Sequence, residues 1–185
     1  GKTTLIKILA TLARPDSGQV RILGLRLGVE NNDIRRFIGV VMHNTLLYGE
    51  LTGYENLAFY AKMFGLSPIS ERVHLVAAQM GMTTRLHQRV RTLSHGMQKR
   101  FSIARALLHD PPVLLLDEPE SGLDQEALGM LESALVRRDG SRRTVLMTTH
   151  NVERGLALAD RVAIIVKGRI AYVDDVKTLD VTTFR

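Results

Sequence analysis

A short apolar segment that ends in two carboxylates constrains the fold of this chain more than any other feature. Residues 113–116 are Val-Leu-Leu-Leu, prolines lie on both sides, and Asp117 and Glu118 follow directly. Such a run is typical of a strand buried on both faces of a parallel sheet. Sheets of this kind place their chemistry at the carboxyl ends of the strands. Because neighbouring side chains on a strand point to opposite faces, we expect one acid to hold a metal and the other to polarise a water molecule.

The first four residues argue against the alternative interpretation, in which the two acids only cap the strand with solvated charge. Gly1 to Thr4 read Gly-Lys-Thr-Thr, and apolar residues follow at the spacing of a helix. A helix N-terminus presents free N–H groups and the positive end of the helix dipole, which together bind phosphate. Gly1 lets the backbone approach the phosphates, Lys2 supplies a cation, and the Thr3 hydroxyl can ligate magnesium. Combined with the strand that ends in Asp117 and Glu118, this start predicts a nucleoside triphosphatase.

Two further segments narrow the class of enzyme. Residues 93–98, Leu-Ser-His-Gly-Met-Gln, precede a helical stretch and form a second helix N-terminus, which carries Ser94 and Gly96. Residues 144–149 have the pattern of another buried strand, and His150 follows it. With these motifs in this order, essentially the whole chain resembles the nucleotide-binding subunit of an ATP-binding cassette (ABC) transporter.

The resemblance implies roles for individual residues. The N–H groups of Gly1 to Thr4 and the Lys2 ammonium would hold the β- and γ-phosphates of ATP, and Thr3 and Asp117 would hold Mg²⁺. Glu118 would be the general base, and His150 would contact the γ-phosphate. Ser94 and Gly96 would donate to ATP bound by a second copy, and Asp124 in the D-loop would bridge two subunits. His95 and Met97 depart from the usual LSGGQ pattern of the signature motif.

The family commonly ends the strand at 38–42 with a glutamine that links the site to the membrane partner. In this chain His43 occupies that position, or Asn44 if the register slips by one residue. Either side chain can form hydrogen bonds, and the sequence does not choose between them.

The implied fold is α/β: a P-loop NTPase with a mostly parallel sheet flanked by helices and an inserted helical subdomain. The residues support the start of that subdomain, because Thr52 and Glu55 have the spacing of a capping box. The expected division is a first part of the RecA-like core at 1–51, a helical subdomain at 52–92, the signature helix with the rest of the core at 93–173, and a tail at 174–185.

Several local features follow from the residues alone. Ser70 is expected to cap a second helix of the subdomain, and His74, His87 and His109 are expected at the surface. The basic segment 137–143 is interpreted as a solvated loop. The remaining predictions are a strand at 19–23, a loop at 24–32, a short helix at 33–37, and a hairpin around Lys167 and Gly168.

The amino-acid composition limits the possible classes of protein but does not identify one of them. The 185 residues include 45% hydrophobic and 24% charged residues, which are values of a globular domain. Zero cysteines fit a reducing cytosol, and no apolar run approaches the roughly 18 residues that span a bilayer. The net charge of +6 is compatible with nucleotide, anionic lipid or nucleic acid. Because the interval before Ser94 has no sustained heptads and no cysteine, DNA-repair relatives are disfavoured and no nucleic acid partner is expected.

The expected assembly is a dimer of ATPase subunits on the cytoplasmic face of the membrane, bound to a polytopic permease. The chain begins inside the phosphate-loop pattern GxxxxGK[ST], so we expect it to be part of a longer protein. Within the export ATPases it is most similar to haem exporters of cytochrome c maturation, on the unusual His43 and Met97. The alternatives are export of a drug, lipid or polysaccharide, or a soluble ABC ATPase acting on ribosomes or DNA.

Overall fold

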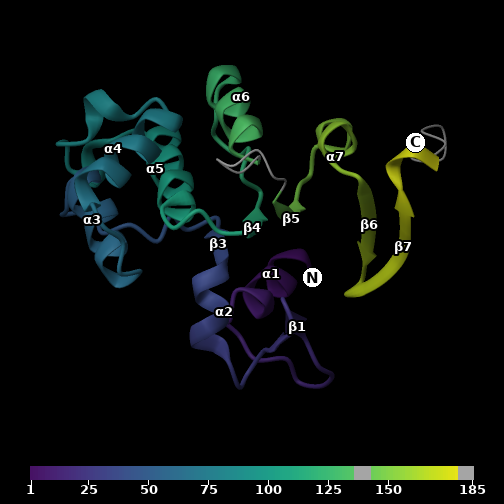
Figure 1. Cartoon of the computed structure of the whole chain (residues 1–185). Helices are drawn as coiled ribbons and strands as arrows, with labels where there is room; N and C mark the ends of the chain where they lie inside the picture. Colours follow the sequence, from purple (N-terminus) through teal and green to yellow (C-terminus); the bar gives the residue numbers. More distant parts are fainter. Residues whose placement is uncertain (136–142, 179–185) are drawn as a thin grey trace.

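A three-stranded parallel sheet lies at the centre of the molecule (Figure 1). The computed structural model describes residues 1–135 and 143–178. The strand order is β3 (Ile38–Val41), β4 (Val113–Asp117) and β5 (Thr144–Thr148), with Leu115 opposite both Val40 and Leu146. The predicted buried strand is therefore the central strand, and the predicted α/β fold with a parallel sheet is confirmed.

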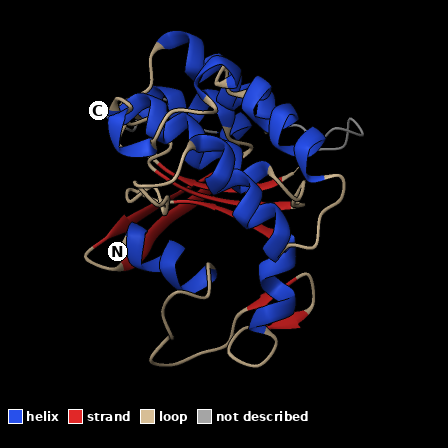
Figure 2. Cartoon of the chain, turned by 90° about the vertical axis from the view of Figure 1, so that its left-hand side faces the viewer, coloured by secondary structure: helices blue, strands red, loops and turns tan. Residues whose placement is uncertain are grey.

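Alternate residues of β4 enter two separate hydrophobic cores. Leu114 and Leu116 belong to a core that also contains residues of the helices α5 (His95–Leu107) and α6 (Gln125–Ala134). Val113 and Leu115 belong to a core with residues of α1 (Lys2–Leu9) and α2 (Asn31–Phe37). Helices therefore cover both faces of the sheet, as Figure 2 shows, and all five residues of β4 are buried. This placement accounts for the unbroken apolar sequence of the strand.

The region 52–92 is helical and packs beside α5. It contains α3 (Gly53–Met63), α4 (Ile69–Gln79) and two short 3₁₀ helices (Thr83–Arg85 and Val90–Thr92). The predicted capping box is confirmed: Thr52 Oγ1 accepts from the Glu55 N–H at 3.1 Å, and Glu55 Oε2 accepts from the Thr52 N–H at 2.8 Å. The predicted Ser70 cap is wrong, because α4 begins at Ile69 and Pro68 occupies the N-cap position without a side-chain cap.

Two antiparallel hairpins and a short helix complete the described chain. The expected loop at 24–32 is wrong, because it contains β2 (Leu25–Arg26), which pairs with β1 (Arg21–Ile22). Leu23 and Gly24 form the connecting turn with φ angles of 51° and 83°. The second hairpin is confirmed around Lys167 and Gly168. It consists of β6 (Arg161–Val166) and β7 (Arg169–Asp175), which come between α7 (Val152–Leu158) and a 3₁₀ turn (Val176–Thr178).

Two surface predictions fail within the described residues. His109 stacks on Phe64 with a centroid distance of 3.9 Å, its Nε2 lies 3.1 Å from the Ile38 carbonyl oxygen, and the residue is partly buried. Arg143 pairs with Asp110 at 2.6 Å, and only 4% of its side chain is exposed. The rest of the predicted basic loop, 137–142, lies outside the described residues, as does the tail from 179. Within the two described ranges, no helix has both the length and the apolar composition needed to cross a bilayer.

Candidate functional site

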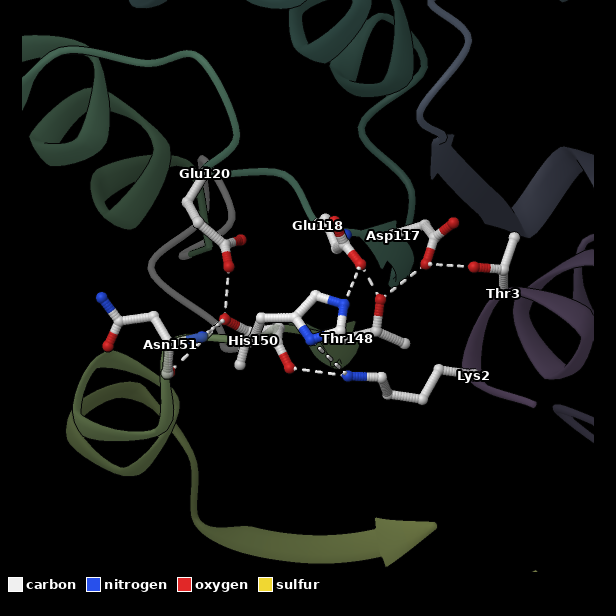
Figure 3. A network of polar contacts seen from close by, with 9 residues as sticks. Lys2, Thr3, Asp117, Glu118, Glu120, Thr148, His150 and Asn151 are labelled. Atoms are coloured by element: carbon white, nitrogen blue, oxygen red, sulfur yellow. Dashed lines mark hydrogen bonds and ion pairs between the residues drawn. The ribbon is translucent and has the colours of Figure 1, made fainter. Parts of the chain in front are cut away.

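The carboxyl ends of β4 and β5 meet the N-terminus of α1, and five of the predicted site residues gather there. Figure 3 shows Lys2 and Thr3 from α1, Asp117 and Glu118 from the end of β4, and His150 after β5. These residues come from three segments of the chain, and the first and last of these segments are more than a hundred residues apart in the sequence. One network of polar contacts joins them. The structure therefore brings together the GKTT turn, the two acids and the histidine.

Asp117 is buried, with 2% of its surface exposed, and two hydroxyl groups bind the same carboxylate oxygen. Thr3 Oγ1 donates to Asp117 Oδ1 at 3.3 Å, and Thr148 Oγ1 donates to it at 2.6 Å. Neither of these bonds uses Oδ2. The sequence analysis missed Thr148, although its place at the end of β5, directly opposite Asp117, follows from the parallel register.

Glu118 lies beyond the strand in a left-handed backbone conformation, with φ of 46°. Its N–H donates to the Thr148 carbonyl at 3.1 Å, and this bond anchors the turn. The turn places Glu118 Oε1 2.7 Å from His150 Nε2. The sequence analysis expected the two acids to point in different directions because side chains alternate along a strand. In the structure, Asp117 contacts Thr3 and Thr148, whereas Glu118, in its left-handed turn, contacts His150. Left-handed conformations of a non-glycine residue often occur at functional sites.

Lys2 and Glu118 contact different nitrogens of the His150 imidazole. Lys2 Nζ lies 3.5 Å from His150 Nδ1 and donates to the Thr149 carbonyl at 3.0 Å. An ammonium group can only donate, so a hydrogen bond from Lys2 would be accepted by Nδ1 and would put the ring proton on Nε2, the nitrogen that faces Glu118.

Two further residues that the sequence analysis missed support the histidine turn. Thr149 Oγ1 donates to Glu120 Oε1, and it also accepts from the Asn151 N–H at 2.9 Å. Asn151 in turn caps α7, because its Oδ1 accepts from the Arg154 N–H at 3.0 Å. Residues on both sides of His150 are therefore held, one by the 120–124 loop and the other by the start of a helix.

The oxygen donors at this site fit Mg²⁺. The Thr3 hydroxyl and the Asp117 carboxylate are hard ligands on neighbouring elements, and Mg²⁺ is usually bound by one or two carboxylates together with substrate phosphates and water. The described residues contain no group of three acidic, histidine or cysteine side chains that could hold a metal alone. A bound triphosphate would thus supply the remaining ligands.

The signature turn, residues 93–97, lies against a different part of the molecule. Ser94 caps α5 and accepts from the Met97 N–H at 3.3 Å. Gly96 packs so closely on the 120–124 loop that an added Cβ would lie 2.7 Å from the Gly122 carbonyl oxygen. A cavity of about 290 Å³ is lined by residues of this turn, of the 120–124 loop and of 81–85, together with Arg100. Ser94 and Gly96 are therefore outside the network of Figure 3.

Asp124 has its partners within the same chain. Both of its oxygens accept from Arg100 Nη2, at 2.7 and 2.8 Å, and Oδ1 also accepts from the Ala127 N–H at 2.9 Å. The Ala127 N–H first, and then the Arg100 guanidinium, hold the pKa of Asp124 below its ordinary value. The predicted bridging role of Asp124 between subunits stays a prediction. The contacts show a link between α5 and the start of α6.

The two candidates for the glutamine position differ in their surroundings. His43 and Asn44 are both exposed and follow β3. The Asn44 side-chain oxygen accepts from the Leu46 N–H at 3.3 Å, which closes a local turn. Asn44 is thus engaged in the structure of its own loop, and this favours His43 as the residue that could face a partner.

Comparison with known proteins gives the family. Residues 1–121 match the family model described as "ABC transporter". The chain belongs to the ABC transporter family. It is 36% identical over 185 residues to the fluoroquinolones export ATP-binding protein of Mycobacterium tuberculosis, covering all of this chain and 61% of that protein. It is 37% identical over 172 residues to the Nod factor export ATP-binding protein I of Burkholderia orbicola, covering 91% of this chain and 56% of that protein.

The fold of this ABC chain matches solved structures as well. One is a dimeric ATP-binding cassette described as a post-hydrolysis state bound to ADP and Pi. The TM-score is 0.84 at 24% identity, and the match covers 97% of this chain and 82% of that one. This likeness shows the fold alone. The ABC chain spans about 60% of the length of the curated relatives it matches, with shares of 58%, 59% and 61% for three of them.

Proposed function

We propose that the protein containing this chain is the ATP-binding and ATP-hydrolysing subunit of an ABC exporter. The observation that carries the proposal is the convergence of Lys2, Thr3, Asp117, Glu118 and His150 at one edge of the sheet. A phosphate-binding helix N-terminus, a pair of oxygen ligands for a metal and an acid–histidine pair are the groups that phosphoryl transfer to water requires.

Each residue then has a task that its contacts support. Lys2 and the N–H groups of Gly1 to Thr4 bind the β- and γ-phosphates, and Thr3 and Asp117 hold Mg²⁺. When bound, Mg²⁺ neutralises charge that develops on the phosphate oxygens. Glu118 accepts the proton of the attacking water. His150 holds the carboxylate of Glu118 from one side, 2.7 Å away, and can contact the γ-phosphate.

The signature turn is proposed to act on ATP bound by a second copy. Ser94 is exposed at the N-terminus of a thirteen-residue helix, and neither it nor Gly96 is in the polar network of the GKTT turn. Two copies arranged head to tail would place each Ser94 turn on the phosphates of the other copy's ATP. The solved structure with the same fold is described as a dimer bound to ADP and Pi, and two copies are what this proposal needs. His43 is proposed to face a polytopic permease on the cytoplasmic side of the membrane.

The exported substrate is proposed to be a drug-like or lipid-like organic molecule. The two relatives described above are named for export of fluoroquinolones and of Nod factors, and a third is a linearmycin resistance protein of Bacillus subtilis. None of these names mentions haem, so the comparisons favour the alternative over the haem exporter that His43 and Met97 suggested. The permease subunit recognises the substrate, so this part of the proposal concerns the whole transporter.

The test uses the full-length protein, its Glu118→Gln variant and a Glu71→Gln control at an exposed position of α4. Glu118→Gln should bind ATP with the affinity of the wild type and hydrolyse it about 10²–10⁴-fold more slowly, the usual contribution of a general base. ATP should convert it to a stable dimer in light scattering. Undiminished hydrolysis would remove Glu118 from this role. Co-purification with ribosomes instead of a polytopic membrane protein would contradict export.

A further inference from the structure

Side chains on one face of α5, and one side chain just after the helix, donate hydrogen bonds to backbone carbonyls. These carbonyls belong to β3 and to the segment that follows β3. Four side chains at positions 99, 102, 105 and 109 each lie at hydrogen-bonding distance from a different carbonyl oxygen. The pairs are Lys99 Nζ to Met42 at 3.2 Å, Ser102 Oγ to Thr45 at 2.9 Å, Arg105 Nη2 to Val40 at 2.7 Å, and His109 Nε2 to Ile38 at 3.1 Å. Spacings of three residues put Lys99, Ser102 and Arg105 on one side of the helix, and His109 follows the end of the helix.

The four contacts fall into two pairs with different targets. Arg105 and His109 bind carbonyls within β3 and so attach the helix to the sheet. Lys99 and Ser102 bind the carbonyls of Met42 and Thr45, which are the residues on either side of His43 and Asn44. The second pair therefore holds the segment 42–45, which carries both candidates for the contact with the membrane partner.

Lys99 is an unusual residue to find in this place. Only 1% of its surface is exposed, and Ser102 is fully buried. Burial of an ammonium group costs free energy that an apolar side chain would not. Burial lowers the pKa of Lys99, and the carboxylates of Asp117, Glu120 and Glu118 oppose that shift. The Lys99 ammonium therefore interacts with these acids through its charge and donates to the Met42 carbonyl, at the start of the segment 42–45.

Ser94 and Lys99 lie on the same helix, five residues apart, which is about 7.5 Å along its axis. A displacement of the signature turn would therefore be transmitted to Lys99 and Ser102 by the helix α5. We infer that Lys99 and Ser102 are positioning residues that couple the signature turn to the segment 42–45. ATP that engages Ser94 would then change the conformation of the segment that meets the partner. This inference rests on the proposed function of the Ser94 turn.

The experiment measures amide hydrogen exchange in the full-length protein with Glu118→Gln, so that Mg-ATP stays bound. In this parent, Mg-ATP should slow exchange at residues 93–98 and at residues 43–47. After addition of Lys99→Met or Ser102→Ala, slowing at 93–98 should persist. Slowing at 43–47 should be lost with Lys99→Met and reduced with Ser102→Ala. ATP affinity and thermal stability are measured in parallel, because a purely structural defect would change those and leave the ATP-dependent response at 43–47 in place.

Matched controls remove the same chemical groups elsewhere. Lys62→Met removes an exposed lysine of α3, and Ser133→Ala removes a hydroxyl that donates to the Gly129 carbonyl within α6 at 2.9 Å. Both should respond to ATP like the parent. A parental response at 43–47 in Lys99→Met overturns the inference. If that variant does not fold, Ser102→Ala decides, and an unchanged response in it overturns the inference.

The outcomes also separate this inference from the function on which it rests. A parent that shows no ATP-dependent change at 93–98 contradicts the proposed role of the signature turn. A parent that changes at 93–98 and not at 43–47 contradicts the coupling alone.

Discussion

Thr148 places its hydroxyl 2.6 Å from Asp117 Oδ1, which makes it a closer partner of the buried acid than Thr3 at 3.3 Å. Both residues of the pair are buried at the ends of neighbouring parallel strands, in direct register. The hydroxyl therefore orients the carboxylate and leaves one oxygen outside the bond. If Asp117 holds Mg²⁺ as proposed, Thr148 is an outer-shell partner that sets the direction in which the ligand points.

Replacement of Thr148 by Val should reduce the apparent affinity for Mg²⁺ by about 10–100-fold, the usual effect of losing an outer-shell partner of a metal ligand. The substitution keeps the branched shape and removes the donor to Asp117, together with an acceptor 3.2 Å from the Glu118 N–H, which retains its bond to the Thr148 carbonyl. The measurement is the Mg²⁺ dependence of ATP hydrolysis by the full-length protein. Thr144→Val, at the exposed opposite end of β5, is the control and should keep the wild-type dependence. An unchanged Mg²⁺ dependence in Thr148→Val would show that Asp117 needs no such orientation.

Loss of the His150 ring should affect turnover and leave nucleotide binding in place. The ring lies between Lys2, at 3.5 Å, and Glu118, at 2.7 Å, so it connects the proposed base to the lysine proposed to bind phosphate. His150→Ala should slow ATP hydrolysis by about 10²-fold or more. The check is kcat against nucleotide affinity, with exposed His87→Ala as the comparison. Equal losses in kcat and affinity would point to a binding role for the ring.

Partly buried His109 should make the protein less stable in weak acid. Burial, opposed by the hydrogen bond to the Ile38 carbonyl and assisted by nearby Arg72, Arg105 and Arg143, lowers the pKa of His109 from 6.5 to about 4. Between these two pH values, His109 therefore binds a proton in the unfolded chain and stays neutral in the folded chain. The contribution of neutral His109 to the free energy of unfolding is complete above pH 6.5 and is lost as the pH falls toward 4, by at most about 3 kcal/mol.

The comparison variant for this effect is His109→Gln, which removes the titrating group and retains a donor for the Ile38 carbonyl. Its unfolding free energy should fall less between pH 7 and pH 4 than that of the wild type, as measured by urea denaturation. His87→Gln, at an exposed position, should follow the wild-type curve. Parallel curves for wild type and His109→Gln would show that His109 is protonated without cost in the fold.

Sequence patterns were sufficient where a local signal and a tertiary requirement coincide. The run 113–116 is apolar because helices cover both faces of β4, and the Gly-Lys-Thr-Thr start is followed by the predicted helix. Thr52 and Glu55 satisfy each other within one helical turn, so their spacing alone was decisive. In each of these cases the residues that carry the signal also make the contact.

The failures are residues whose partners are distant in the sequence. Lys99 has the appearance of a solvated lysine in a basic stretch, and only its contact with Met42, 57 positions away, shows that it is buried. His109 and Thr148 are similar, because their bonds to Ile38 and Asp117 depend on how strands and helices are placed. The β1–β2 hairpin was missed because two-residue strands have no periodicity to detect.

Two glycines give opposite predictions for the same substitution. An added Cβ at Gly39 in β3 would lie 2.4 Å from the Ala106 carbonyl oxygen and 2.8 Å from Pro111, so the strand and α5 would have to separate. Gly39→Ala should destabilise the protein by about 1–3 kcal/mol or more.

Gly129 in α6 is exposed and has nothing within 4 Å of an added Cβ. Gly129→Ala should stabilise it by about 0.5–1 kcal/mol, because alanine loses less conformational freedom in a helix. Urea denaturation of both variants checks the signs, and a tolerated Gly39→Ala would mean that α5 does not pack on β3 as closely as this structure has it.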